Sequence, residues 1–333
     1  MTTYEDIDPS QFDRPRRRTR PRTKERPTYA DAVDGFVVTV DRGRFTVRVR
    51  PDGADERTVT AMKSRPLGRK GVVVGDRVRV VGDVSGAVDT LARIVEVTDR
   101  TTVLRRTADD DDPVERILVA NADQLVIVTA VANPEPRPRL IDRALVAAYD
   151  AGLDPLLCIT KVDLADPEVV LSTYRPLGVP YVVTQRGTDL AQVQERLSDR
   201  VSVLLGHSGV GKSTLVNALV PGAARTTGDV NVVTGRGRHT STSVVALELP
   251  FGGWVMDTPG IRSFGLAHVD PRHLIHAFDD LAALTDDCPR GCTHGESEPE
   301  CALDDAIADG RVAADRVTSF RRLLASRERT EGD

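Results

Sequence analysis

The sequence has few cysteines, few aromatic residues and no long apolar run. Four of its 333 residues are Cys, and aromatic side chains make up 4%. Four cysteines are too few for the disulfide framework of a small secreted protein. No apolar stretch approaches the ~20 residues that a membrane-spanning helix needs, and the polar N-terminus lacks the apolar core of a signal peptide. We therefore expect a cytoplasmic protein with no membrane partner.

Charge is spread unevenly along the chain. The net charge is -5, yet Lys and Arg dominate residues 14–26 and residues 109–112 are all Asp. The low apolar content of residues 1–32 predicts a disordered basic arm. This arm is either a solvated tail or a segment that neutralises nucleic-acid phosphates.

Short β-rich runs follow the arm, over residues 33–106. Residues 36–40 and 45–49 flank a Gly-containing turn and predict a hairpin. Residues 72–81, a strand pair broken at Gly75-Asp76, and residues 91–97 supply further strands. About four or five strands in a segment of this size favour a small barrel of the oligonucleotide-binding type. Other small barrels share the pattern.

The next segment, residues 107–266, alternates apolar strands with helical stretches. Residues 125–130, 155–160 and 201–205 are continuous apolar runs, which are typical of a parallel sheet covered on both faces. We expect an α/β domain here, with Cys158 in its core.

A phosphate-binding loop lies inside this segment. Residues 206–213 read Gly-His-Ser-Gly-Val-Gly-Lys-Ser between a predicted strand and a predicted helix. The glycines let backbone N–H groups turn inward around phosphates. Lys212 is expected to reach the β- and γ-phosphates, and Ser213 to ligate Mg²⁺. The nucleotide-binding residues of this loop are expected to be Gly206, His207, Ser208, Gly209, Val210, Gly211, Lys212, Ser213 and Thr214, with His207 at the surface.

Two further motifs indicate which nucleotide is bound. Asp257 and Gly260 follow an apolar run at the positions where P-loop proteins hold Mg²⁺ and sense the γ-phosphate. Thr160, Lys161 and Asp163 resemble the guanine-recognition motif of GTPases. A carboxylate at Asp163 accepts from guanine N1–H and N2–H₂, a donor pair that adenine lacks. The expected ligands are therefore GTP and GDP.

The order of these motifs along the chain differs from that of ordinary GTPases. In ordinary GTPases the phosphate loop comes first, whereas here residues 160–163 precede residues 206–213. Joining the old termini and opening new ones leaves a sheet unchanged, since domain termini often lie close together. The order predicts a circularly permuted P-loop GTPase domain.

The remaining cysteines cluster near the C-terminus. Cys288, Cys292, His294 and Cys301 offer three thiolates and one imidazole, the ligand set of a closed structural zinc site. The surrounding residues 267–333 are expected to form a helical zinc-binding domain.

The permuted order, the β-barrel before it and the Cys/His cluster after it resemble the ribosome small-subunit-dependent GTPases (RsgA, also called YjeQ). The resemblance covers residues 35–324, and further matching segments are residues 74–78, 120–124, 140–143, 235–242 and 257–265. It implies an enzyme that hydrolyses GTP to GDP and phosphate and is stimulated by the small ribosomal subunit. It also implies a role in late maturation of that subunit through rRNA binding. The cofactors would be Mg²⁺ and one structural Zn²⁺, the protein a monomer, and DNA is not expected as a partner.

Some positions depart from the family pattern. Thr160 stands where Asn is usual, which we expect to weaken the link between the base loop and the phosphate loop. Thr184 is assigned to the fifth GTPase motif, although the usual Ser-Ala is missing.

Ile261 occupies the position where many GTPases keep a water-orienting Gln. His239 is the predicted replacement, because a neutral imidazole can orient water; the alternatives are RNA binding or a plain loop position. Thr240 is assigned to Mg²⁺, with Ser241 and Thr242 as alternatives.

Two other functions remain open. One is a nucleic-acid-binding module whose nucleotide site only gates affinity, and the other is a permuted GTPase that serves another RNA or a membrane partner. Measuring GTP turnover with and without small subunits separates the enzyme from the binding module.

Overall fold

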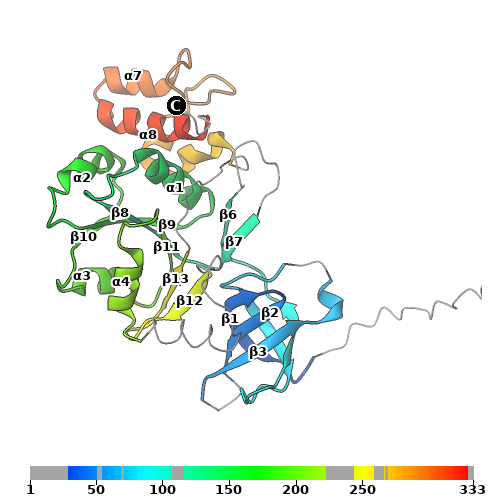
Figure 1. Ribbon diagram of the computed structural model, residues 1–333. Helices are drawn as coiled ribbons and strands as arrows, with labels where there is room; N and C mark the ends of the chain where they lie inside the picture. The colour runs from blue at the N-terminus through cyan, green and yellow to red at the C-terminus, as the bar shows by residue number, and fades with distance from the viewer. Residues whose placement is uncertain are drawn as a thin grey trace, which may run out of the picture. The chain divides into compact units, whose positions relative to one another are not determined.

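The computed structural model describes residues 29–50, 55–68, 71–106, 116–222, 244–258, 266 and 269–328 (Figure 1). Most of the predicted basic arm therefore lies outside the described residues. One 11-stranded sheet, in the order β10-β9-β8-β11-β13-β12-β1-β2-β3-β5-β4, connects the α/β part to the barrel. No helix within these ranges combines the length and apolar character needed to cross a membrane.

A five-stranded barrel follows the arm. Its strands are β1 (Val33–Asp41), β2 (Arg44–Val49), β3 (Arg57–Lys63), β4 (Arg77–Gly82) and β5 (Ala92–Val97). Pairing of β1 with β4 closes the barrel. Every second residue of β2, namely Phe45, Val47 and Val49, is buried inside it. The barrel confirms the sequence-based fold class. Residues 72–74 were expected to form a strand before the break at Gly75-Asp76, but there Val74 makes only an isolated bridge to Val119.

The chain leaves the barrel through a two-stranded ladder of β6 (Val103–Arg106) and β7 (Arg116–Ala120). Short 3₁₀ turns lie at Arg65–Leu67 and Arg175–Leu177, named η2 and η3.

The α/β part has five parallel strands and one antiparallel strand. They are β8 (Gln124–Ala130), β9 (Asp154–Thr160), β10 (Tyr181–Thr184), β11 (Val201–Leu205), β13 (Trp254–Asp257) and the antiparallel β12 (Val245–Glu248). β8, the first strand of this part in the chain, lies inside the sheet between β9 and β11. β9 and β10 extend the sheet on one side of β8, and the later strands β11 and β13 extend it on the other. That order is the expected consequence of permutation.

Helices cover both faces of this sheet. Leu125 and Ile127 of β8 pack in one apolar cluster with α1 (Pro138–Asp150) and α2 (Glu168–Tyr174). Val126 and Val128, which alternate with them, pack in a second cluster with α3 (Ala191–Leu197) and α4 (Lys212–Leu219). The two-sided burial explains why these strands read as continuous apolar runs.

The C-terminal part is helical, as expected. It contains η4 (Pro271–Ala277), α6 (Asp279–Ala282), α7 (Ala302–Ala308) and α8 (Ala314–Glu328). Phe278 and Phe320 pack edge to face, with ring centroids 5.3 Å apart, in the same apolar cluster as α1. The domain boundaries at residues 106/107 and 266/267 stay predictions.

Candidate functional site

The predicted nucleotide motifs meet at one edge of the parallel sheet. Thr160 ends β9, Thr184 ends β10, and Asp257 ends β13, while the phosphate loop starts directly after β11. Parallel pairing of these strands brings their carboxyl ends together, which is where open α/β sheets bind ligands. Thr184 pairs in register with Thr160, so the fifth-motif residue lies beside the base loop.

The phosphate loop connects β11 to α4. Gly206 is buried against β8. The two backbones are so close that a Cβ on Gly206 would overlap the carbonyl oxygen of Val128. Gly209 and Gly211 have φ values of 86° and 101°, which L side chains rarely adopt. Because α4 begins at Lys212, its first-turn N–H groups face the loop and offer an anion site.

Lys212 and Asp257 form the charged centre of the site. Lys212 Nζ donates to the Gly206 carbonyl at 2.8 Å. Burial lowers the pKa of Lys212, against the attraction of Asp257, and burial raises the pKa of Asp257, against the attraction of Lys212. Their mutual attraction favours the charged forms that binding a phosphate and a cation requires.

The carboxylate of Asp257 is suited to a magnesium site. Its Oδ1 is buried and has no hydrogen-bond partner among the described residues, and a buried acceptor of this kind is costly unless a ligand satisfies it. Ser213 lies exposed in the first turn of α4 with Thr214 beside it. Oxygen ligands of these two types fit Mg²⁺.

The base loop is tied to the phosphate loop. Lys161 Nζ donates to the Gly209 carbonyl at 2.9 Å and also to the carbonyl of Asn133. Thr160 Oγ1 lies 2.6 Å from the Val210 carbonyl. The hydroxyl of Thr160 therefore links the base loop to the phosphate loop, although the replacement of Asn by Thr was expected to weaken this link. Asp163 is exposed on the turn that follows.

The loop after β8 is a part of this site that sequence reasoning missed. Asn133 accepts from Lys161, and Pro134 lies 3.6 Å from the position of a Cβ on Gly209. No motif marks these residues. The signal is topological: β8 neighbours β11, so the loop at its carboxyl end must flank the phosphate loop.

The prediction that His207 lies at the surface is wrong. Its exposed fraction is 5%, and its Nδ1 lies 3.0 Å from the Ser208 carbonyl. Burial is the main reason that its pKa is lowered.

Several predicted residues lie outside the described ranges. They are His239, Thr240 with its alternatives Ser241 and Thr242, Gly260 and Ile261.

The four predicted zinc ligands come together. The donor atoms of Cys288, Cys292, His294 and Cys301 all lie within 4.8 Å of one another. His294 Nδ1 is 3.5 Å from the sulfurs of Cys288 and Cys292 and 3.8 Å from that of Cys301. Tetrahedral zinc with ordinary bond lengths separates sulfur and nitrogen by about 3.5 Å. The cluster therefore fits a structural zinc ion.

Burial raises the pKa of the Cys292 thiol to about 12, so a bound cation would be needed to hold it as a thiolate at neutral pH. Arg321 supports the cluster by donating to the His294 carbonyl at 3.2 Å while it pairs with Asp304 at 2.7 Å. Cys158 is buried in β9 and takes no part.

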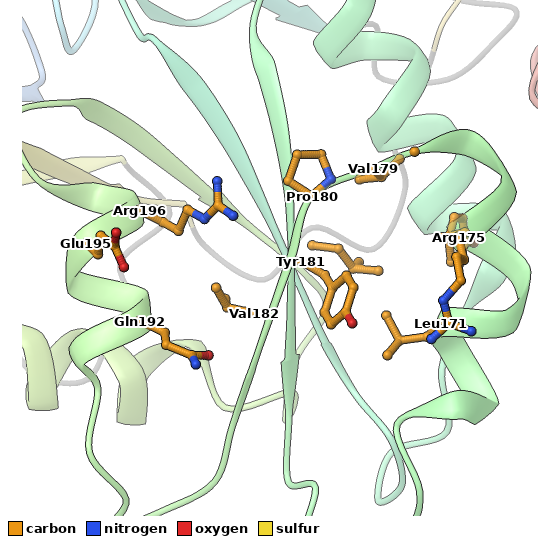
Figure 2. Close-up of a pocket in the computed structure, with 12 residues that line it drawn as sticks. Leu171, Arg175, Val179, Pro180, Tyr181, Val182, Gln192, Glu195 and Arg196 are labelled. Carbon is orange, nitrogen blue, oxygen red and sulfur yellow. The ribbon is translucent and has the colours of Figure 1, made fainter.

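A cavity of about 590 Å³ lies elsewhere, at the amino-terminal end of β10 (Figure 2). Side chains of α3, such as Gln192, line one side of β10, and those of α2 and η3, such as Leu171 and Arg175, line the other. None of the predicted nucleotide or zinc residues lines it.

A phosphate loop between β11 and α4, with Asp257 and residues 160–163 at the same sheet edge, defines a P-loop protein of the circularly permuted GTPase fold. The sequence model described as RsgA GTPase matches residues 97–267, which is more than half of the chain. The chain belongs to the RsgA GTPase family.

Curated relatives carry the name "Small ribosomal subunit biogenesis GTPase RsgA". The protein of Ectopseudomonas mendocina (strain ymp) is 45% identical over 218 residues, which cover 63% of each chain. That of Pseudomonas fluorescens (strain SBW25) is 42% identical over 242 residues, covering 70% of this chain and 69% of the relative. For the first relatives, the match spans 63% to 65% of their own length.

Two solved structures share the fold. The crystal structure of YjeQ from Thermotoga maritima is 27% identical with a TM-score of 0.66, covering 89% of this chain and 99% of that one. YloQ, described as a circularly permuted GTPase, is 24% identical with a TM-score of 0.64, covering 91% and 98%. The second likeness concerns the fold alone.

Proposed function

We propose that this protein is an enzyme that hydrolyses GTP to GDP and phosphate, and that the small ribosomal subunit stimulates it. One observation carries the nucleotide part of the proposal: the phosphate loop, Asp257 and the turn at residues 160–163 converge at one sheet edge. The names of the relatives support the small subunit as partner and its maturation as the process.

The residues of the site would have separate roles in binding the phosphates, Mg²⁺ and the base. Lys212 would neutralise the β- and γ-phosphates, and the loop N–H groups would orient them in line for attack. Ser213, Asp257 and Thr240 would hold Mg²⁺, which neutralises charge that develops on the phosphate oxygens. Asp163 would select guanine, with Thr160, Lys161 and Thr184 shaping the base pocket, and Gly260 would sense the γ-phosphate.

The other parts of the chain would bind and hold the ribosomal particle. The barrel would contact rRNA, and Zn²⁺ held by Cys288, Cys292, His294 and Cys301 would stiffen the C-terminal helices. The proposed division is a basic arm at residues 1–32, the barrel at 33–106, the GTPase domain at 107–266 and the zinc domain at 267–333. The protein would act as a cytoplasmic monomer.

The first experiment is GTP turnover by the full chain with and without purified small subunits. The proposal predicts slow turnover alone and at least about tenfold stimulation by small subunits but not by large subunits. Lys212→Ala should abolish both rates. Tight GTP binding without stimulated turnover would instead favour the binding module that only gates nucleic-acid affinity.

His239 is the proposed water-positioning residue. Because the imidazole would act on the attacking water and not on the bound nucleotide, His239→Ala should keep GDP affinity and lower stimulated turnover by at least about tenfold. Unchanged stimulated turnover would remove His239 from the mechanism.

A further inference from the structure

Side chains of the phosphate loop and of the neighbouring loop after β9 contact the carbonyl groups of the phosphate loop. The four donor–acceptor pairs are Lys212 Nζ with Gly206 O at 2.8 Å, His207 Nδ1 with Ser208 O at 3.0 Å, Lys161 Nζ with Gly209 O at 2.9 Å, and Thr160 Oγ1 with Val210 O at 2.6 Å. Three of these side chains occupy defining positions of nucleotide motifs, whereas His207 occupies a variable position of the phosphate-loop motif.

Holding a carbonyl also sets the direction of the next N–H group. In a planar trans peptide, the C=O of one residue and the N–H of the following residue point in opposite directions. A carbonyl of Ser208 held by the buried His207 therefore turns the Gly209 N–H away from the ring. Successive N–H groups turned this way form the concave site that binds anions.

The contact also requires a proton on one particular ring nitrogen. A carbonyl oxygen can only accept, so His207 Nδ1 must carry a proton. Nε2 is buried without a partner among the described residues. A neutral ring leaves a lone pair on Nε2, whereas a charged ring would bury a second N–H there without an acceptor among those residues.

The surroundings favour that neutral ring. Burial lowers the pKa of His207, and the positive charges of Arg137, Lys212 and Lys161 lower it further, against the effect of the Ser208 carbonyl. A second proton on Nε2 would add a positive charge near three others, without an acceptor among the described residues.

We propose that His207 is a positioning residue of the nucleotide site: its Nδ1–H holds the Ser208 carbonyl and thereby aims the Gly209 N–H at the bound phosphates. This inference rests on the proposed function, because it assumes that phosphates bind in the loop. In this role the ring touches neither phosphate nor the attacking water.

The opposing interpretation is that His207 only fills space beneath the loop. Substitutions distinguish the two roles. Asn can place an amide nitrogen near the position of Nδ1, Gln places it near Nε2, and Leu keeps the volume without a donor. Only Asn should replace the bond to Ser208.

The test is titration of the full chain with a fluorescent GDP analogue. We expect His207→Asn to bind within about threefold of the unsubstituted chain and His207→Leu and His207→Gln to bind about tenfold more weakly, the effect of one lost hydrogen bond to the loop. His273→Asn, at an exposed position on η4, is the matched control and should change nothing. Equal affinity of the Asn, Gln and Leu variants would overturn the proposal.

A second measurement does not depend on nucleotide or on the folding of the Leu variant. In ¹⁵N-histidine spectra of the nucleotide-free chain at neutral pH, His207 should show a protonated Nδ1 and an unprotonated Nε2, assigned by the signal lost in His207→Asn. The reverse tautomer would refute the proposal. Failure of the unsubstituted chain to bind GDP would count against the proposed function, whereas the tautomer would still report on the Ser208 contact.

Discussion

At the residue scale, one hydroxyl joins the base loop to the phosphate loop. Thr160 Oγ1 lies 2.6 Å from Val210 O and 3.2 Å from Thr129 O. A hydroxyl has a single proton to donate, so the shorter contact to Val210 is the one it makes. The hydroxyl thus provides a link that the change from Asn to Thr was expected to weaken.

Removing that hydroxyl should weaken nucleotide binding. Thr160→Val keeps the shape of the side chain but leaves the Val210 carbonyl without its donor, so we expect GDP affinity to fall about tenfold. Thr160→Ser keeps the donor and should bind within about threefold of the unsubstituted chain. Titration with a fluorescent GDP analogue measures both, and equal binding by the Val and Ser variants would refute the link.

Residues fixed by a motif were easier to predict than residues fixed by packing. Two separate motifs predicted that Lys212 and Asp257 lie at one site, and the pairing of the parallel strands β11 and β13 brings their carboxyl ends together. The burial of His207 was not predictable in this way. It depends on folding of the phosphate loop, a tertiary feature that the motif does not encode.

At the scale of elements, the turn before β4 packs against the end of β7. Gly75 has a φ of 90°, and a Cβ on it would overlap the carbonyl oxygen of Ala120. Asn121 Nδ2 donates to the Gly75 carbonyl at 2.9 Å from a buried position. The turn therefore requires glycine for both its conformation and its closeness to the neighbouring backbone.

Substitution of this glycine should be more costly than that of another glycine with the same conformation. Gly75→Ala adds overlap to strain and should lower the free energy of unfolding by about 3 kcal/mol. Gly43, with a φ of 85° and nothing within 4 Å of an added Cβ, provides the control. Gly43→Ala should cost about 1 kcal/mol. Denaturant unfolding compares the two variants, and equal losses would contradict the account of Gly75.

The zinc cluster yields a prediction for the C-terminal helices. Cys288→Ser removes one of four ligands, so bound zinc should fall from about one ion per chain to near zero. The melting temperature should fall by at least about 5 °C, since binding of a structural zinc contributes to folding.

Cys158→Ala is the control, because Cys158 is buried in β9 and distant in sequence from the cluster. It should keep its zinc, even if it is less stable. Metal content is measured by emission spectrometry of the purified chain. Full zinc occupancy in Cys288→Ser would contradict the assignment.

Elements with local signals were predictable, and long-range pairings were not. The apolar runs of β8, β9 and β11 identified buried parallel strands before any pairing was known. The ladder Thr39↔Val245 between β1 and β12 joins segments about 200 residues apart, and no local pattern marks such a partner. The β6–β7 ladder was missed for a related reason, since its two short strands lack a tight turn signal.

At the scale of the whole molecule, the barrel is bonded to the strands that flank the nucleotide segments. Besides the Thr39↔Val245 pairing, Phe36 packs at a tilt against Trp254 of β13 with ring centroids 4.8 Å apart, and Arg48 pairs with Glu248 of β12 at 2.7 Å. β13 ends at Asp257 itself. The barrel therefore contacts the strand that carries the proposed magnesium ligand.

The central claim is that hydrolysis occurs at the described guanine site and responds to the small subunit. In the proposed site, Asp163 would offer two acceptor oxygens to the two donors of guanine. Asparagine offers one acceptor and one donor, which match xanthine, because xanthine has a carbonyl oxygen in place of the 2-amino group. Asp163→Asn should therefore change the preferred substrate from GTP to XTP.

The most direct test is nucleotide turnover by Asp163→Asn in the presence of small ribosomal subunits, with Asp305→Asn, exposed on α7, as control. The account predicts subunit-stimulated hydrolysis of XTP by the Asp163 variant, with GTP hydrolysis reduced at least about 100-fold. The control should hydrolyse GTP as the unsubstituted chain does. Stimulated GTP hydrolysis that persists unchanged in Asp163→Asn would contradict the account, because the reaction would then not depend on this base site.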